Sequence, residues 1–156
     1  MTPGKRSMEI HKARGNQVQA VVHRLLFGED DPEATIYEAR ARQHLARGRL
    51  SPVLVDAAID DAVRREFFNR LKRDGAGKHQ VTRVPPLYLY LVSLLRGGAP
   101  VSGNPATLAW LASDWGKKSL SVLIDLGLLV RNGQNAVGLT PRGRKLTTSI
   151  QVELGL

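Results

Sequence analysis

A short hairpin set between two helices constrains the fold more than any other part of the chain. Leu128–Arg131 and Ala136–Leu139 have the length and apolar character of strands, and the Asn132-Gly133 pair between them favours a tight turn. Gly127 permits the sharp reversal that leads into the first strand. Thr140-Pro141 begins a helix where the second strand must end, because proline cannot continue a β-ladder. The sequence therefore predicts helix, hairpin and helix in direct succession.

Further elements precede this hairpin in the same half of the chain. An apolar helix over Leu87–Leu95 is followed by a short extended segment at 99–102. Asn104-Pro105 caps a short helix over Ala106–Ala112, and another helix covers roughly Lys117–Leu126. The predicted order is helix, extended segment, helix, helix, hairpin and helix.

That order is the order of a winged helix-turn-helix, and the residues resemble bacterial and archaeal winged-helix regulators of the MarR, PadR and ArsR kind. The resemblance is confined to the C-terminal half of the chain. Three segments carry it: Gly98-Ala99-Pro100-Val101-Ser102, Leu123-Ile124-Asp125-Leu126-Gly127-Leu128-Leu129-Val130-Arg131 and Leu139-Thr140-Pro141-Arg142-Gly143-Arg144-Lys145-Leu146.

The start of the helix that leads into the hairpin has two interpretations. Counting back from Leu126-Gly127-Leu128, families of this kind start the helix near Ser113-Asp114. Gly116 then stands where they commonly have a buried β-branched residue. Starting at Lys117 instead makes the helix about a turn short.

The resemblance implies which residues would contact DNA. The recognition helix enters the major groove with its N-terminal residues leading. Lys117 and Lys118 would then meet phosphates or guanine edges, and Ser119 or Ser121 would be smaller groove contacts. The wing and the last helix would add contacts to the backbone or the minor groove through Arg131, Asn132, Gln134, Asn135, Arg142, Arg144 and Lys145. Against this, lysines at a helix start and arginines on a helix face are often only solvated.

The first half of the chain reads as purely helical. We expect one helix over Asn16–Phe27 and a second from Pro32 to about Arg47, with Asp31 as its N-cap. A third helix begins at Ser51-Pro52 and runs unbroken towards the linker. It carries an apolar stripe for the core or a dimer interface: Val55, Ile59, Val63 and Phe67.

Two glycines in Asp74–His79 mark the clearest linker in the chain. The expected fold is therefore mainly α. It combines a helical region at 1–74 for dimerisation or accessory DNA contact, a linker at 75–84, and a winged helix-turn-helix domain with a two-stranded wing at 85–156.

The charge balance favours polyanionic partners. The chain has 23 Lys and Arg against 14 Asp and Glu, a formal charge of +9, and such a balance suits DNA, RNA or an acidic membrane surface. Two basic groups lie outside the winged helix. One is an N-terminal arm that either reaches along DNA or is disordered: Lys5, Arg6, His11, Lys12 and Arg14. The other is a cluster able to grip a phosphate backbone: Arg40, Arg42, Arg47 and Arg49.

Several kinds of chemistry find no support in the sequence. The absence of cysteine removes disulfides, thiolate catalysis and cysteine-based zinc sites, and it suits a reducing cytoplasm. Gly75–His79 is no phosphate loop, because Lys72 stands where its first glycine should be. The histidines lack metal-ligand spacing, and no nucleophile–base pair is visible. No apolar run is long enough to span a membrane. We expect a cytoplasmic, nucleoid-associated protein that is not an enzyme and needs no metal or cofactor.

The predicted function is sequence-specific binding of double-stranded DNA by a homodimer, most plainly as a transcriptional regulator. Two alternatives stay open. One is a plasmid or viral factor for replication, partition or nucleoid architecture, which uses the same reading head. The other is a winged helix that docks on a protein of the transcription or replication machinery, such as RNA polymerase.

Overall fold

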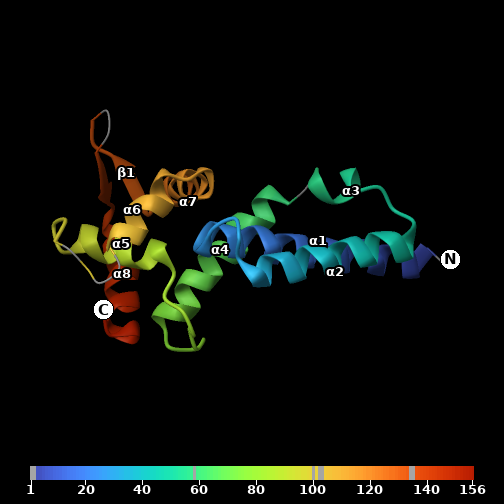
Figure 1. Ribbon diagram of the computed structural model, residues 1–156, viewed down its shortest axis with the longest axis horizontal. Helices are drawn as coiled ribbons and strands as arrows, with labels where there is room; N and C mark the ends of the chain where they lie inside the picture. The colour runs from blue at the N-terminus through green and yellow to red at the C-terminus, as the bar shows by residue number, and fades with distance from the viewer. Residues whose placement is uncertain (1–2, 58, 100, 102–103, 134–135) are drawn as a thin grey trace. The chain divides into compact units, whose positions relative to one another are not determined.

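The protein is mainly helical, with a small two-stranded antiparallel sheet near its C-terminus, as a computed structural model shows (Figure 1). The structure describes residues 3–57, 59–99, 101, 104–133 and 136–156. Its elements are α1 (Pro3–Phe27), α2 (Pro32–Gly48), α3 (Val53–Asp56), α4 (Asp60–Gly75), α5 (Pro86–Leu95), α6 (Asn104–Ala112), α7 (Asp114–Asp125), β1 (Leu129–Arg131), β2 (Val137–Leu139) and α8 (Pro141–Leu154). The mainly α class is confirmed. None of the described helices has the length and apolarity needed to cross a bilayer.

The chain divides into two compact units. Residues 1–24 and 29–67 form the N-terminal unit, and residues 25–28 and 68–156 form the C-terminal unit. The division falls inside α4, between Phe67 and Phe68, ahead of the predicted linker. The linker at 75–84 stays a prediction. The two units are defined by contacts within the chain, and such contacts do not show which segment joins independently folding domains.

The N-terminal unit is built on the antiparallel pair α1 and α2 (Figure 1). Asp31 caps α2 as predicted, with its carboxylate accepting from the Ala34 N–H at 3.2 Å and proline in the first turn. The basic N-terminal arm is helical, because α1 begins at Pro3. A buried apolar cluster joins α1 and α2 to α3: Ala13, Leu45, Leu50 and Val55.

A part-buried hydrogen-bonded pair also links α1 to α2. His44 Nδ1 lies 2.7 Å from Glu9 Oε2, and Glu9 is buried. The hydrogen bond with His44 is the main cause that lowers the pKa of Glu9 below its usual value. The pair therefore favours an ionised Glu9 in the folded unit.

The single helix expected after Ser51-Pro52 is wrong, because α3 ends at Asp56 and α4 begins at Asp60. Asp60 and Asp61 lie in the first turn of α4, where carboxylates are stabilised by the partial positive charge of a helix N-terminus. The apolar stripe is nevertheless mostly core, because Val55, Val63 and Phe67 are buried within the chain and Ile59 is partly buried against the cluster.

The C-terminal unit is organised around α5, which begins after Pro85 as expected and packs against α6, α8 and β2. Four of its apolar side chains are buried: Leu87, Tyr88, Leu91 and Val92. Four apolar residues of the later elements are buried as well: Leu123, Leu128, Leu129 and Ile150. The apolar face that the sequence assigned to Leu87–Leu95 is therefore the centre of this core.

A buried polar network joins α5 to the end of α4. The Tyr88 hydroxyl donates to Asp74 Oδ2 at 2.5 Å, and Arg70 Nε donates to the same oxygen at 3.3 Å. All three side chains are buried. Burial, and then the charge of Asp74, raises the pKa of Tyr88 well above its usual value. Asp74, which the sequence placed at the start of a linker, is thus part of the core.

The predicted hairpin and closing helix are confirmed. β1 and β2 pair antiparallel, with Leu129 opposite Leu139 and Arg131 opposite Val137. Thr140 caps α8 by accepting from the Gly143 N–H at 3.0 Å, with proline in the first turn. The Thr140 hydroxyl also donates to the Gly127 carbonyl at 2.6 Å. The start of α8 therefore holds the reversal between α7 and β1.

Candidate nucleic-acid interface

The turn between α6 and α7 consists of little more than Ser113. Its hydroxyl donates to the Trp110 carbonyl at the end of α6 and accepts from the Gly116 N–H at 3.2 Å. Ser113 is thus the N-cap of α7, and it is also hydrogen-bonded to the end of α6. Such a short connection brings the backbones of the two helices into contact.

Gly116 is required by that contact. A Cβ atom at this position would overlap the Trp110 carbonyl oxygen and would come within 2.7 Å of Leu111 Cα. Of the two interpretations left open by the sequence, the early start is therefore the observed one, with α7 beginning at Asp114. A β-branched residue cannot occupy Gly116 because α6 and α7 touch there through their backbones.

The two faces of α7 differ sharply in exposure. Gly116, Ser119 and Leu123, spaced as one helical stripe, are buried in the unit. The opposite face is exposed and carries Asp114, Lys117, Lys118, Ser121 and Asp125. The ammonium of Lys118 lies 4.5 Å from the centroid of the Trp115 ring, so its position is steadied by an aromatic neighbour.

Ser119 is not a candidate for contact with DNA. Its side chain is fully buried, and its hydroxyl donates to the Leu25 carbonyl at 2.6 Å, which ties α7 to the end of α1. The prediction of a groove contact at Ser119 is wrong, because the residue lies on the core side of α7. Ser121, on the exposed side, remains.

The wing residues that the structure describes are exposed. Arg131 ends β1, and the Asn132 N–H donates to the Ala136 carbonyl at 2.8 Å, which closes the hairpin. Gly133 has a φ of 86°, a conformation that glycine adopts without strain. Figure 1 shows the hairpin projecting from the helices of this unit. The predicted contacts Gln134 and Asn135 lie outside the described residues.

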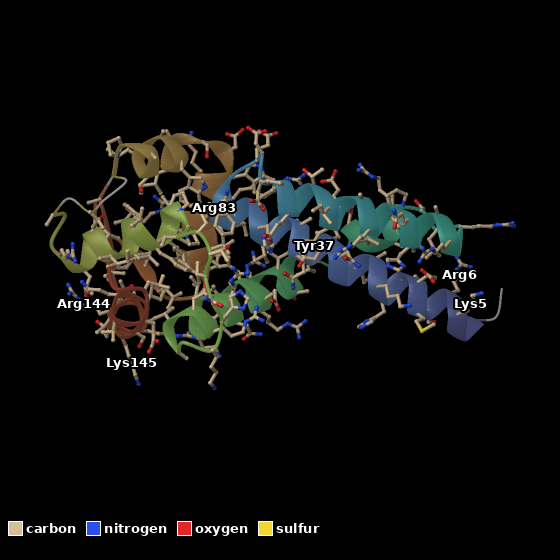
Figure 2. All side chains as sticks on the ribbon, turned by 60° about the horizontal axis from the view of Figure 1, so that its bottom comes forward. Lys5, Arg6, Tyr37, Arg83, Arg144 and Lys145 are labelled. Atoms are coloured by element: carbon tan, nitrogen blue, oxygen red, sulfur yellow. The ribbon has the colours of Figure 1, made fainter. Side chains whose placement is uncertain are left out.

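The cations at the start of α8 divide into two kinds. The Arg142 guanidinium donates to the Leu126 carbonyl at 3.0 Å and lies 4.6 Å from the centroid of the Phe68 ring. Arg142 therefore fastens the end of α7 in place. Arg144 and Lys145 extend outward from α8 (Figure 2), so their charges are open to solvent.

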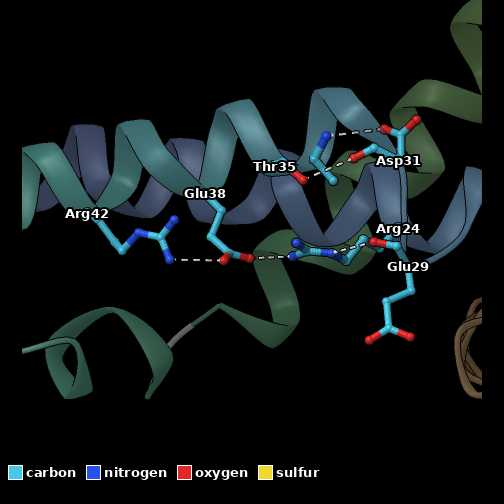
Figure 3. A network of polar contacts seen from close by, with 7 residues as sticks. Arg24, Glu29, Asp31, Thr35, Glu38 and Arg42 are labelled. Carbon is cyan, nitrogen blue, oxygen red and sulfur yellow. Dashed lines mark hydrogen bonds and ion pairs between the residues drawn. The ribbon is translucent and has the colours of Figure 1, made fainter.

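The arginine cluster of the N-terminal unit is more heavily engaged. Glu38 accepts from Arg42 at 3.2 Å and from Arg24 at 2.6 Å (Figure 3). The Arg40 guanidinium lies 5.6 Å from the centroid of the Tyr37 ring. Arg47, in the last turn of α2, is exposed.

The exposed cations of α7, the wing and α8 share one electrostatic property. Within the part of the chain that the structure describes, none of them has a carboxylate within ion-pair distance: Lys117, Lys118, Arg131, Arg144 and Lys145. Residues 85–156 hold 7 Lys and Arg against 3 Asp and Glu. The C-terminal unit therefore presents positive charge that it does not neutralise itself.

Sequence reasoning missed the aromatic partners of several cations. Arg83 lies 4.1 Å from the centroid of the Phe27 ring, and Lys72 lies 4.7 Å from that of Phe68. Phe27 and Arg83 are far apart along the chain, so no local pattern could have joined them. The partners of Phe68 come from different helices and depend on the tertiary fold.

Among the described residues, no group of three or more His, Asp and Glu side chains is arranged to hold a metal ion. Comparison with family models, with curated proteins and with solved structures found no match to this chain.

Proposed function

We propose that residues 85–156 form a winged helix-turn-helix that binds double-stranded DNA, with α7 as the recognition helix and β1–β2 as the wing. The order α5, α6, α7, β1, β2, α8 supports this assignment. So does the one-residue turn between α6 and α7, which leaves the outer face of α7 uncovered within its own unit. A projecting helix face is the element that enters a major groove in proteins of this type.

The observation that carries the proposal is the set of unpaired cations on α7, β1 and α8. An unpaired surface charge keeps its counterions and can exchange them for a phosphate. Contacts of this kind position a protein on the duplex and supply affinity without reading sequence. The charge of the C-terminal unit is thus available to a polyanion.

Specificity would come from the outer face of α7. Lys117 and Lys118 can donate to guanine O6 and N7, and the Ser121 hydroxyl can donate to or accept from a base edge. Few base pairs can be read by so short a face, so a homodimer on two half-sites is the expected binding form. We further propose that the bound protein regulates transcription, as the simplest use of sequence-specific DNA binding by a winged helix.

The test is a titration of a labelled mixed-sequence duplex at several salt concentrations between about 50 and 200 mM. Wild type is compared with Lys117→Gln/Lys118→Gln and with the matched variant Arg40→Gln/Arg47→Gln. Both variants remove two exposed positive charges, one pair from each unit. We expect the α7 variant to lose affinity and to flatten the plot of log K against log salt by about two units of slope. The matched variant should behave as wild type.

The remaining outcomes each point elsewhere. An effect of Arg40→Gln/Arg47→Gln alone would move the DNA contact to the N-terminal unit and overturn the role of α7. No binding at low salt would overturn the DNA proposal as a whole. Leu108, which is 59 % exposed on α6, would then favour a winged helix that docks on a protein.

A further inference from the structure

The C-terminal unit contains a cleft, and of the exposed unpaired cations proposed to bind DNA only Lys145 lines it. Its volume is about 490 Å³, within the usual range for small-molecule sites. The end of α4 forms one wall and α8 forms the other: Phe68, Lys72, Gly75, Ala76, Leu128, Arg142, Lys145, Leu146 and Ser149 line it.

Close helix packing defines one end of the cleft. A Cβ added to Gly75 would meet Ile150 and Ser149 at 3.2 Å, so α4 and α8 approach closely at that glycine. Away from it the two helices leave room over the apolar side chains of Phe68, Leu128 and Leu146. The floor is therefore apolar and preformed.

The rim of the cleft is positive. Lys72, Arg142 and Lys145 contribute three cations, and none of the nine lining residues, all of them described, is acidic. Lys72 and Arg142 both lie within 5 Å of the centroid of the same Phe68 ring. These like charges on one ring repel each other, and an anion between them would relieve that repulsion.

We propose that this cleft binds a small amphipathic anion, a molecule with a carboxylate or similar group on an apolar body. The anionic group would lie among Lys72, Arg142 and Lys145, and the body would cover Leu128 and Leu146. An apolar floor with a few convergent polar groups is the usual composition of a ligand site. Neither a neutral apolar molecule nor a bare anion matches both halves of the lining.

Through Arg142, a ligand in the cleft could also affect α7. Its guanidinium holds the Leu126 carbonyl at the end of α7, so an anion that draws Arg142 towards the cleft acts on the helix that we propose reads DNA. The ligand site itself does not depend on the DNA proposal. Binding is therefore tested without DNA.

The probe is octanoate, a free monomeric carboxylate, with 1-octanol as its neutral match. Binding is followed by the amide NMR signals of Gly75, Ala76 and Ser149 in the full-length protein. We expect octanoate to shift these signals and to bind about tenfold more tightly than octanol. Lys72→Gln and Lys145→Gln should each weaken octanoate about two- to fivefold and leave octanol unchanged. Both lysines are exposed, so the fold should survive.

Lys118→Gln is the matched control, because it removes an exposed lysine of the same unit that does not line the cleft. It should leave octanoate binding unchanged. Equal affinities for octanoate and octanol, an equal loss in Lys118→Gln, or shifts confined to amides outside the cleft would overturn the proposal. Binding to anionic phospholipid vesicles without any response to octanoate would also overturn it, in favour of a membrane surface.

Discussion

The two units differ in how much of their surface positive charge is paired with carboxylates. In the N-terminal unit Glu38 binds both Arg24 and Arg42. In the C-terminal unit the cations of α7, the wing and α8 have no such partner among the described residues, whereas Arg70 pairs with Asp74 inside the core. Both halves of the sequence are basic, and the N-terminal unit pairs more of its surface charge, although its exposed Arg40 and Arg47 form none of the described ion pairs.

This difference shows why net charge alone is a poor guide to a binding surface. Residues 1–84 hold 16 Lys and Arg against 11 Asp and Glu, a larger number of cations than the rest of the chain. An arginine already paired with a carboxylate gains less from a phosphate, because the ion pair must first be given up. The pairing of each cation therefore matters more than the total.

Two glycines, Gly116 in α7 and Gly15 in α1, one in each unit, differ in how closely other atoms approach them, and this contrast gives the largest expected effect. Gly116→Val should destabilise the C-terminal unit by about 3 kcal/mol or more, because the side chain would overlap the backbone of α6. Gly15→Ala, in the interior of α1, meets no atom within 4 Å and should stabilise by about 0.5–1 kcal/mol. Urea unfolding followed by circular dichroism measures both. Equal effects at the two glycines would contradict the close contact of α6 with α7.

The buried network of Tyr88 and Asp74 gives the next effect. Tyr88→Phe should cost about 1–3 kcal/mol at neutral pH, because Asp74 loses a hydrogen-bond donor while it stays buried. The folded-state pKa of Tyr88 is raised above its ordinary value of 10.0, so its contribution to stability is complete below pH 10 and is lost above it. Tyr88→Phe should remove this part of the alkaline loss.

Tryptophan fluorescence can follow that alkaline loss in one unit alone. Both tryptophans of the chain, Trp110 and Trp115, belong to the C-terminal unit. The control is Tyr37→Phe in the N-terminal unit, which should leave the fluorescence-detected unfolding unchanged. An alkaline profile that is identical in wild type and Tyr88→Phe would show that other groups cause the loss.

The serines of α7 test the division between its two faces. Ser119→Ala should cost about 1–2 kcal/mol, because the buried Leu25 carbonyl loses the hydroxyl that donates to it. It should not alter the salt dependence of DNA binding. Ser121→Ala should leave stability within about 0.5 kcal/mol of wild type and weaken DNA binding instead. The reverse pattern would exchange the buried and exposed faces of α7.

Local signals in the sequence were enough to predict most of the elements. The caps Asp31 and Thr140, each followed by proline, mark the starts of α2 and α8 correctly. The hairpin followed from its Asn-Gly turn and two apolar runs. These features depend on neighbouring residues, which is why one sequence suffices to find them.

Features set by tertiary contacts could not be predicted in the same way. Helical spacing gives two faces without saying which one is buried, so it wrongly predicts Ser119 as a groove contact. The break between α3 and α4 was missed because Asp60 and Asp61 suit a helix start as well as a helix face. The need for glycine at position 116 follows from the backbone contact with α6, which the sequence does not show. The cleft brings together α4 and α8, which no local pattern connects.

The smallest expected effect tests whether ion pairing is what separates the units. Glu38→Gln removes the carboxylate that binds Arg24 and Arg42, and it should cost less than about 1 kcal/mol because the pair with Arg42 is exposed. If pairing keeps the N-terminal unit off DNA, the released charge should steepen the salt dependence of binding by about one unit of slope.

Glu29→Gln provides the matched control for that release. It removes the same charge from an exposed side chain that forms none of the described ion pairs (Figure 3). A steeper slope in Glu38→Gln than in Glu29→Gln would show that the two units differ through pairing. Equal slopes would mean that the cations released from Glu38 in the N-terminal unit make no contact with DNA. The shape of α7 and the wing would then be the reason that the C-terminal unit binds DNA. The comparison would in that case rest on geometry and not on charge.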